Sequence, residues 1–148
     1  MTSELARRDW MSLLAKAPAQ TLQSLWQATG LDPEFSWLRS PEIGATMVRG
    51  RMGGTGAPFN LGEMTVTRCS LQLTSGEVGH AYIQGRDKAK ARIAAIVDAL
   101  MQGPQGENLR ATLIARLEAE MLAAKSKRAA KAAATKVDFF TMVRGEDQ

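Results

Sequence analysis

A glycine-rich break between two strand-like runs is the feature that most constrains this chain. The stretch from Met47 to Cys69 begins with strand character, passes through Gly53, Gly54 and Gly56, and resumes strand character without a polar linker. Glycine permits positive φ and close backbone approach, so these residues predict a tight connection. Pro58 fixes one φ and restricts the preceding residue to extended conformations, which stiffens the loop. A stiff surface loop favours recognition; a hairpin connection without a ligand is the alternative.

Neither common nucleotide motif fits these glycines. A dinucleotide fingerprint opens a helix, whereas Gly54-Thr55-Gly56 is followed three residues later by Phe59 and then by strand-like sequence. The phosphate loop requires a Gly-Lys pair, which occurs nowhere in the chain. The glycine spacing therefore does not indicate a nucleotide-binding site.

Length and composition favour a small intracellular protein. At 148 residues the chain is expected to form one domain over 1–148. The lone Cys69 has no internal disulfide partner, the first residues lack the apolar core of a secretory signal, and no run approaches the ~18 apolar residues of a membrane span. We therefore expect a cytoplasmic protein. The net charge of +4 and the pI near 9.6 favour anionic partners in general but identify no ligand.

Two helices are predicted in the first 30 residues. The residues at helical spacing, apolar except for Thr29, are Trp10, Leu13, Leu14 and Ala17 in the first helix, and Leu22, Leu25, Trp26 and Thr29 after Pro18 in the second. Gly30 is predicted to end the second helix. Asp32-Pro33 then predicts a further short helical turn carrying Phe35, Trp37 and Leu38. We interpret the tryptophans as packing residues.

The middle of the chain predicts an antiparallel sheet. Strands are expected at 41–52, 61–73 and 77–84, with a Thr74-Ser75-Gly76 turn joining the last two. Both faces of the second strand mix polar and apolar residues, which suits helices on one face and a partner protein or a second copy on the other; solvent exposure of the second face is the alternative. The predicted class is α+β, with N-terminal helices, an antiparallel sheet of about three or more strands, and C-terminal helices, completed by partner subunits.

Two helices are predicted after the sheet. Asp87 is expected to cap the first, which ends near Gly103-Pro104. The second starts at Glu107 or Asn108 and carries apolar residues at Leu109, Leu113, Ile114, Leu117 and Met121. Beyond Met121, alanine keeps the segment helical and the charges are basic, so we expect it to dock on a partner, helped by Val137, Phe139 and Phe140; a solvated basic tail is the alternative. The expected organisation is helical over 1–40, sheet over 41–85, helical over 87–134, and a C-terminal tail over 135–148.

The sequence offers few catalytic candidates. His80 is the only histidine. It is a weak candidate for a general base, with a structural or interface hydrogen bond as the favoured alternative. Cys69 lies on a predicted strand away from any helix N-terminus, so we interpret it as structural. One histidine and one cysteine fall short of the usual metal ligand sets, so no metal site is predicted.

Arginines flank the glycine loop. Arg49, Arg51 and Arg68, with the loop amides, have the chemistry to cradle a triphosphate or phosphonate, or to pair with carboxylates of an adjoining subunit, which we rank higher. Glu63 is a candidate local ion-pair partner for Arg51 or Arg68. The interface or anion-binding loop is thus predicted to comprise Arg49, Arg51, Gly53, Gly54, Thr55, Gly56, Asn60, Glu63 and Arg68.

The same region resembles a known family. The segments that carry the likeness are Arg49–Cys69, Gly79–Tyr82 and Gly85–Asp87, with Arg8–Ala15 and Trp37–Gly44 upstream. They resemble the PhnG family, whose members are subunits of the phosphonate carbon-phosphorus lyase system. The resemblance covers the chain up to about residue 105, and the alanine- and lysine-rich final third contributes little to it.

The resemblance implies a role in a complex. The family's complex displaces the adenine of ATP with a phosphonate, giving ribose 1-phosphonate 5-triphosphate. The nucleoside chemistry is associated mainly with subunit I, and the later carbon-phosphorus cleavage with subunit J, which carries an iron-sulfur cluster and uses S-adenosylmethionine. The PhnG protein is implied to be an accessory member of the core with subunits H, I and J, to pair with itself within the complex, and to bind no cofactor alone.

Three functions remain open at this point. The first is the accessory subunit that the resemblance implies. The second is a catalytic contributor, in which the glycine loop with Arg51 and His80 completes a shared site. The third is nucleic-acid binding through the basic C-terminal helix, which ranks last because few aromatic residues accompany the basic ones.

Overall fold

The computed structural model describes residues 6–51, 54 and 56–146, with side chains up to residue 136 except at Asn60. The chain divides into two units, Met1–Leu117 and Glu118–Gln148. The elements are, in order, α1 (Arg7–Lys16), α2 (Ala19–Thr29), β1 (Phe35–Arg51), β2 (Pro58–Leu73), β3 (Val78–Gln84), α3 (Lys88–Met101), α4 (Gly106–Leu109), the π-helical segment η2 (Arg110–Ile114) and α5 (Ala115–Glu146). The α+β class predicted from the sequence is confirmed.

The two N-terminal helices form where the apolar spacing predicts them. Trp10 and Leu14 of α1 and Leu22 and Trp26 of α2 are buried, so the tryptophans of both helices are packing residues. Gly30 ends α2 in the left-handed conformation, with φ of 68°. Glycine adopts this conformation without the steric cost that a Cβ would add, which is why the helix ends there.

The sheet is antiparallel with strand order β1-β2-β3. The short helical turn predicted after Asp32-Pro33 is wrong, because β1 already begins at Phe35. There Phe35 pairs with Leu73 and Trp37 with Leu71. The rings of Phe35 and Trp37, two residues apart on one face, meet edge to face at 5.0 Å. Pairing with the far end of β2 therefore outweighs the local helix signal, and β2 likewise begins at Pro58 rather than residue 61.

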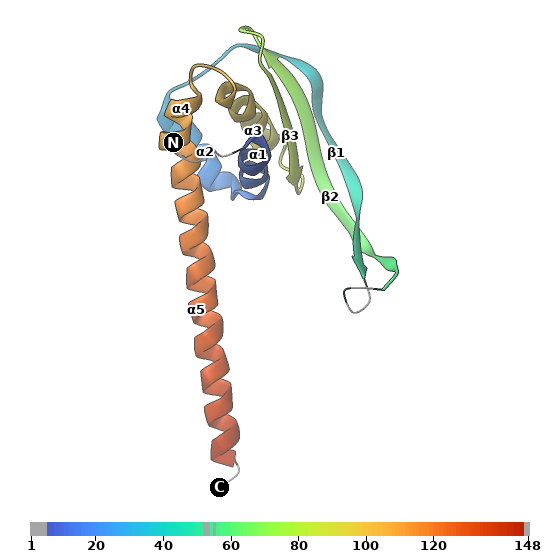
Figure 1. The fold of residues 1–148 in the computed structure, drawn as a ribbon, viewed down its shortest axis with the longest axis vertical. Coiled ribbons are helices and arrows are strands. Elements are labelled where there is room, and N and C mark those ends of the chain that lie inside the picture. Colours follow the sequence, from blue (N-terminus) through green and yellow to red (C-terminus); the bar gives the residue numbers. More distant parts are fainter. Residues whose placement is uncertain (1–5, 52–53, 55, 147–148) are drawn as a thin grey trace. The chain divides into compact units, whose positions relative to one another are not determined.

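Helices α1 and α3 pack against one face of the sheet (Figure 1). Asp87 caps α3 as predicted, because its Oδ1 accepts a hydrogen bond from the Lys90 amide at 2.9 Å. Gly79 of β3 brings helix and strand together: a Cβ at this position would lie 1.9 Å from the Ala95 carbonyl oxygen. Only glycine fits so close a backbone contact. The core between these layers includes Cys69, Leu71, Ile83, Ala91, Ala95 and Val97.

The helix predicted from Glu107 contains a π-helical segment. Leu109, Leu113, Ile114 and Leu117 are all fully buried, as the apolar spacing predicts. A step of four residues overshoots an α-helical turn by about 40°. The wider turn at 110–114 takes up this excess and helps to keep the leucines on one face.

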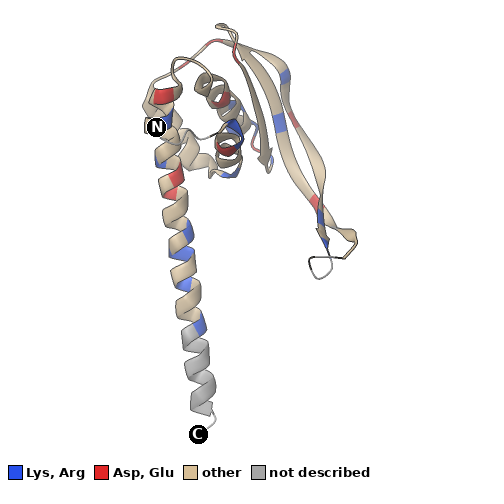
Figure 2. Cartoon of the chain, in the orientation of Figure 1, with Lys and Arg blue, Asp and Glu red and all other residues tan. Residues whose placement is uncertain are grey.

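The second unit is the described length of α5 from Glu118 onward. The helix runs to Glu146, so it continues through the segment where the tail was expected to begin. From residue 118 to 136 the side chains are exposed, apart from the partly buried Met121. Basic residues are the only charged ones from 125 to 136 (Figure 2). The side chains of Val137, Phe139 and Phe140 lie outside the described set.

Candidate functional site

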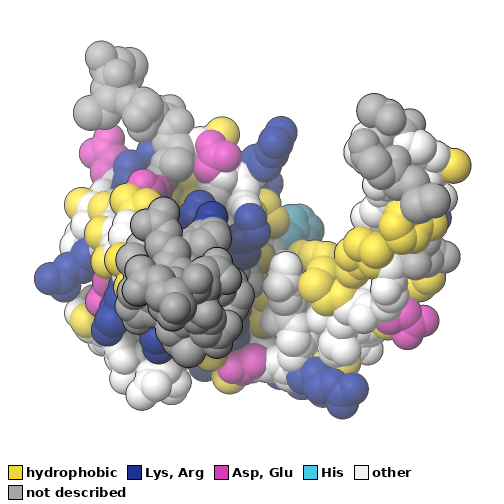
Figure 3. Space-filling model, turned by 90° about the horizontal axis from the view of Figure 1, so that it is seen from below, with side chains coloured by type: hydrophobic (Ala, Val, Ile, Leu, Met, Phe, Trp, Pro, Cys, Tyr) yellow, Lys and Arg dark blue, Asp and Glu magenta, His cyan; other side chains and the backbone are white. Residues whose placement is uncertain are grey.

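A two-stranded ribbon extends from the sheet. Beyond Val66, which pairs with Gln84 at the end of β3, the strands β1 and β2 pair only with each other. Large apolar side chains are exposed along this ribbon, at Met47, Val48, Phe59 and Leu61, the last with 62% of its surface accessible. Figure 3 shows hydrophobic side chains gathered along it. Met47 and Val48 follow one another in β1, so apolar side chains are exposed on both faces of the ribbon. Exposed apolar side chains gathered in this way indicate a contact with another macromolecule.

The glycine loop closes the ribbon. Gly54 has φ of 79°, and the Arg51 guanidinium donates to the Gly56 carbonyl at 3.4 Å, an exposed contact across the turn. Arg49 lies opposite Asn60, so both loop arginines are at the ribbon's end. Gly53, Thr55 and the side chain of Asn60 lie outside the described residues. The binding role predicted for this loop stays a prediction.

Arg68 is not part of the loop. It pairs across the sheet with Glu42 and Tyr82, and its Nε lies 3.7 Å from Glu42 Oε2. Ten residues along β2 separate it from Pro58, a distance of about 33 Å at the usual strand rise of about 3.3 Å per residue. Among the described residues no ion pair involves Glu63, which lies opposite Met47. Proximity in sequence placed Arg68 too near the turn, because β2 is long enough to carry it away.

Ser70 and His80 form a cross-strand pair on the exposed face of the sheet. They are register partners, and Ser70 Oγ lies 2.8 Å from His80 Nδ1. His80 faces outward together with Tyr82, as the strand alternation predicts. Among the described residues the contact with Ser70 is the only hydrogen bond to the imidazole ring, and no carboxylate orients the ring as in a catalytic triad. The contact agrees with the favoured alternative, a structural hydrogen bond, and the general-base role of His80 stays a prediction.

A buried carboxylate missed by the sequence reasoning organises one end of the first unit. Asp98 is fully buried and accepts hydrogen bonds from Arg7 Nη2 at 2.9 Å and Nε at 3.2 Å, from Trp10 Nε1 at 2.8 Å and from the His80 amide at 2.9 Å. It thereby ties α1 and β3 to α3. The hydrogen bond with Asp98 raises the pKa of Arg7. The only signal in the sequence is a carboxylate inside an otherwise apolar run, a position that requires paired donors.

A second contact holds the other end of α1. Lys90 of α3 donates from Nζ to the Ala15 carbonyl at 3.0 Å. Burial lowers the pKa of this lysine, and the nearby Asp87 partly opposes that shift. Helix α1 is thus fixed to α3 at both ends.

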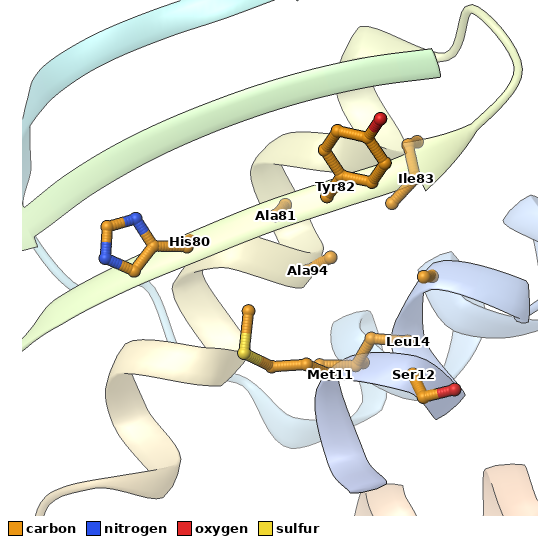
Figure 4. A pocket seen from close by; sticks show the side chains of 9 residues that line it. Met11, Ser12, Leu14, His80, Ala81, Tyr82, Ile83 and Ala94 are labelled. Atoms are coloured by element: carbon orange, nitrogen blue, oxygen red, sulfur yellow. The ribbon is translucent and has the colours of Figure 1, made fainter. Parts of the chain in front are cut away.

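Between these contacts a small pocket opens beside β3 (Figure 4). Its volume is about 170 Å³, and α1, β3 and α3 supply its walls. Met11, Leu14, Ala81, Ile83 and Ala94 make it largely apolar. The Tyr82 ring points away from Met11, toward the exposed face of the sheet. Such a lining suits a small aliphatic group.

Cys69 is a buried thiol. Its Sγ donates to the Ala91 carbonyl at 3.4 Å, and burial raises its pKa to about 11. The thiol is therefore protonated at neutral pH and is a poor nucleophile.

Neither a metal centre nor a membrane span is present among the described residues. In the part of the chain that is described, no group of three or more His, Cys, Asp or Glu side chains is placed to hold a metal ion. Over that same part, no helix combines the length and apolar character needed to cross a membrane.

Comparison with known proteins identifies the family of this chain. Residues 5–145 match the family model described as phosphonate metabolism protein PhnG. The chain belongs to the PhnG family. A PhnG relative from Rhizobium meliloti (strain 1021), alpha-D-ribose 1-methylphosphonate 5-triphosphate synthase subunit PhnG, is 50% identical over 145 residues. The alignment covers 95% of this chain and 90% of that relative. PhnG membership thus extends well beyond the glycine loop and includes the C-terminal helix.

Proposed function

We propose that this chain is an accessory subunit of the complex that transfers a phosphonate to C1′ of ATP with release of adenine, in phosphonate catabolism. The observation that carries the proposal is the 50% identity to a subunit of alpha-D-ribose 1-methylphosphonate 5-triphosphate synthase. The product would be alpha-D-ribose 1-methylphosphonate 5-triphosphate. The chain contributes to the assembly of this complex rather than a complete active site.

The exposed apolar ribbon supports the accessory role. Phe59 and Leu61 are large apolar side chains that are 42% and 62% solvent-accessible in the chain by itself, which is unfavourable unless another surface covers them. Arg49 and Arg51 at the ribbon's end supply fixed positive charge for partner carboxylates. The chemistry of the residues thus favours contact with protein over a self-contained site.

The partners we propose are subunits H, I and J of the carbon-phosphorus lyase core, in the cytoplasm, and this chain also pairs with itself within the assembly. ATP enters as the substrate of the complex. The iron-sulfur cluster and S-adenosylmethionine belong to another subunit in this proposal, and this chain binds no cofactor alone. The exposed ribbon and helix α5 are the surfaces that we assign to subunit contacts.

Reconstitution tests the proposal. Subunits H, I and J are expressed with and without this chain, and adenine release from ATP and methylphosphonate is measured. We expect release only when this chain is present, and none from this chain alone. Full activity of the isolated chain, or of the complex without it, would contradict the accessory role.

A matched pair of variants tests the ribbon. Leu61→Ser removes the apolar side chain from a position that is already exposed, so the fold of the chain is expected to persist. Burial of a leucine is worth about 1.5–3 kcal/mol, so affinity for the other subunits falls roughly tenfold or more. Leu61→Met keeps the apolar surface and should bind like the wild type. Equal binding of the serine variant would remove Leu61 from the interface.

A further inference from the structure

Strand β3 forms one edge of the sheet, and its pairing decides which backbone groups face outward. Leu73 N donates to the Glu77 carbonyl, and Gly85 N donates to the Thr65 carbonyl. Hydrogen-bonded and non-hydrogen-bonded pairs alternate in an antiparallel ladder. The odd-numbered residues from 77 to 85 therefore bond to β2, and the even-numbered residues direct their N–H and C=O groups to the free edge.

Side chains cap the first half of this edge. The His80 N–H donates to Asp98 at 2.9 Å. The Val78 carbonyl accepts from Gln102 Nε2 at 2.8 Å and from Arg7 Nη2 at 3.3 Å. The protein thus satisfies the edge with charged and amide side chains from α1 and α3, which also blocks strand pairing there.

The second half of the edge carries no such caps. Within the described part of the chain, no hydrogen bond reaches the His80 carbonyl, the Tyr82 N–H and carbonyl, or the Gln84 N–H. These groups follow one another at the spacing of a strand partner. The apolar pocket lined by Met11 and Ala94 adjoins the same residues of β3.

We propose that an extended segment of a different polypeptide chain adds to this half of β3 as a fourth strand and places one aliphatic side chain in the pocket. Strand addition at an exposed edge takes its affinity from main-chain hydrogen bonds and its specificity from side-chain pockets, and this site has both elements. A small molecule does not supply donors and acceptors in strand register. The identity of the donor as a subunit of the same complex rests on the proposed function.

The opposite edge of the sheet, formed by β1, is less suitable for the addition of a strand. Strand β1 carries Pro41, and its register with β2 shifts at three places, around residues 38, 40 and 48. Prolines and bulges are the means by which proteins protect an edge from pairing. Strand β3 has neither over Val78–Gln84.

A second copy of β3 is a poor donor for the pocket. Its apolar side chains Ala81 and Ile83 are already buried under α3. The side chains left exposed in its central part are those of His80 and Tyr82, which are polar at their tips. The occupant we assign is therefore a strand from another subunit that has an aliphatic residue to offer.

Proline substitution at the open edge tests the proposal. Tyr82→Pro removes an N–H that bonds to nothing within the described sheet, whereas Tyr82→Ala removes the same side chain and keeps the N–H. In full-length chain co-expressed with subunits H, I and J, we expect the proline variant to capture at least tenfold less complex than the alanine variant. Circular dichroism and thermal melting of both chains verify the fold. Equal capture by two folded variants overturns the inference.

Filling the pocket gives a second variant that leaves the edge intact. Ala15 lines the pocket and is partly exposed. Ala15→Leu occupies the space reserved for the incoming side chain, so capture of the complex should fall severalfold. Ala28→Leu, at an exposed alanine on α2, provides the same substitution away from the pocket and should leave capture unchanged. Unchanged capture by Ala15→Leu contradicts the assignment of the pocket.

If the Tyr82→Pro variant does not fold, amide hydrogen exchange of the wild-type chain tests the strand addition instead. In the isolated chain the amides of Tyr82 and Gln84 should exchange fast, whereas those of Ala81 and Ile83, bonded to β2, exchange slowly. In the complex the first two should slow at least a hundredfold. Amides that stay fast in the complex, or that are already slow in the isolated chain through self-pairing, overturn the inference. Failure of the wild-type chain to capture any subunit is a separate result, and it overturns the proposed function as well.

Discussion

The Arg7 guanidinium lies 2.9 Å from the Asp98 carboxylate, although 91 residues separate them in the chain. Arg7 begins α1, and Asp98 is fully buried in α3. The same carboxylate accepts from Trp10 and from the backbone of His80. One buried side chain thus fixes the first helix and caps the edge of the sheet.

Replacing this carboxylate should destabilise the chain strongly. Asp98→Ala leaves three donor groups without their acceptor, and breaking a buried pair in this way typically costs about 3–5 kcal/mol. Chemical denaturation of the full-length chain measures the loss. Asp9→Ala removes an exposed carboxylate from the same helix as Arg7 and should change the free energy of unfolding by less than about 1 kcal/mol. A small effect at Asp98 would show that its hydrogen bonds contribute little.

Adding one methyl group at Gly79 should also destabilise the fold. A Cβ there meets the Ala95 carbonyl at 1.9 Å, so Gly79→Ala must push α3 away from β3. Overpacking of this kind costs typically about 1–3 kcal/mol. Gly44 lies in β1, and a Cβ added there would have no other atom within 4 Å, so Gly44→Ala is the matched control and should be nearly neutral. Thermal melting of both variants distinguishes the two sites.

Two substitutions in the assembled complex separate an accessory role from a catalytic one. His80 contacts Ser70, and Arg51 contacts a loop carbonyl, which are structural hydrogen bonds. We therefore expect His80→Ala and Arg51→Ala to leave adenine release within about twofold of wild type once assembly is complete. General acid–base groups contribute about 10²–10⁴-fold to rate, so a loss of that size at His80 would assign it to the chemistry.

The thiol of Cys69 predicts a pH dependence. Its pKa rises from 9.0 to about 11 on burial, so the unfolded chain ionises at lower pH than the folded chain. The stability contributed by the protonated thiol is complete below pH 9 and declines as the pH rises from 9 toward 11. Alkylation by iodoacetamide should accordingly be slow in the folded chain at pH 8 and fast in urea. Rapid alkylation of the folded chain at pH 8 would contradict a buried, protonated thiol.

The local elements could be predicted because their signals are local. Apolar residues at helical spacing located α1 and α2, Gly30 ended α2, and Asp87 capped α3. The strands were found with errors at their ends. Phe35 and Trp37 were predicted to lie in a helical turn because the preceding Asp-Pro favours one. Their pairing with Leu73 and Leu71 in the sheet is instead a long-range contact.

The candidate site was harder to predict. Arg68 was grouped with the loop because it is close in sequence, although a long strand carries it away. Asp98 was overlooked because its donors come from α1 and β3, which adjoin α3 only in the folded chain. The division of the β3 edge into a capped half and an open half could not be predicted either, because it depends on which residues pair with β2.

The sequence by itself determined the family, the α+β class and most of the helix and strand positions, because periodicity, capping and turn residues act over a few neighbours. Only the tertiary structure decided that Asp98 is a shared acceptor, that Gly79 is a helix contact, and that Tyr82 presents an open backbone edge. Those properties depend on groups brought together from distant parts of the chain, and no local pattern specifies them.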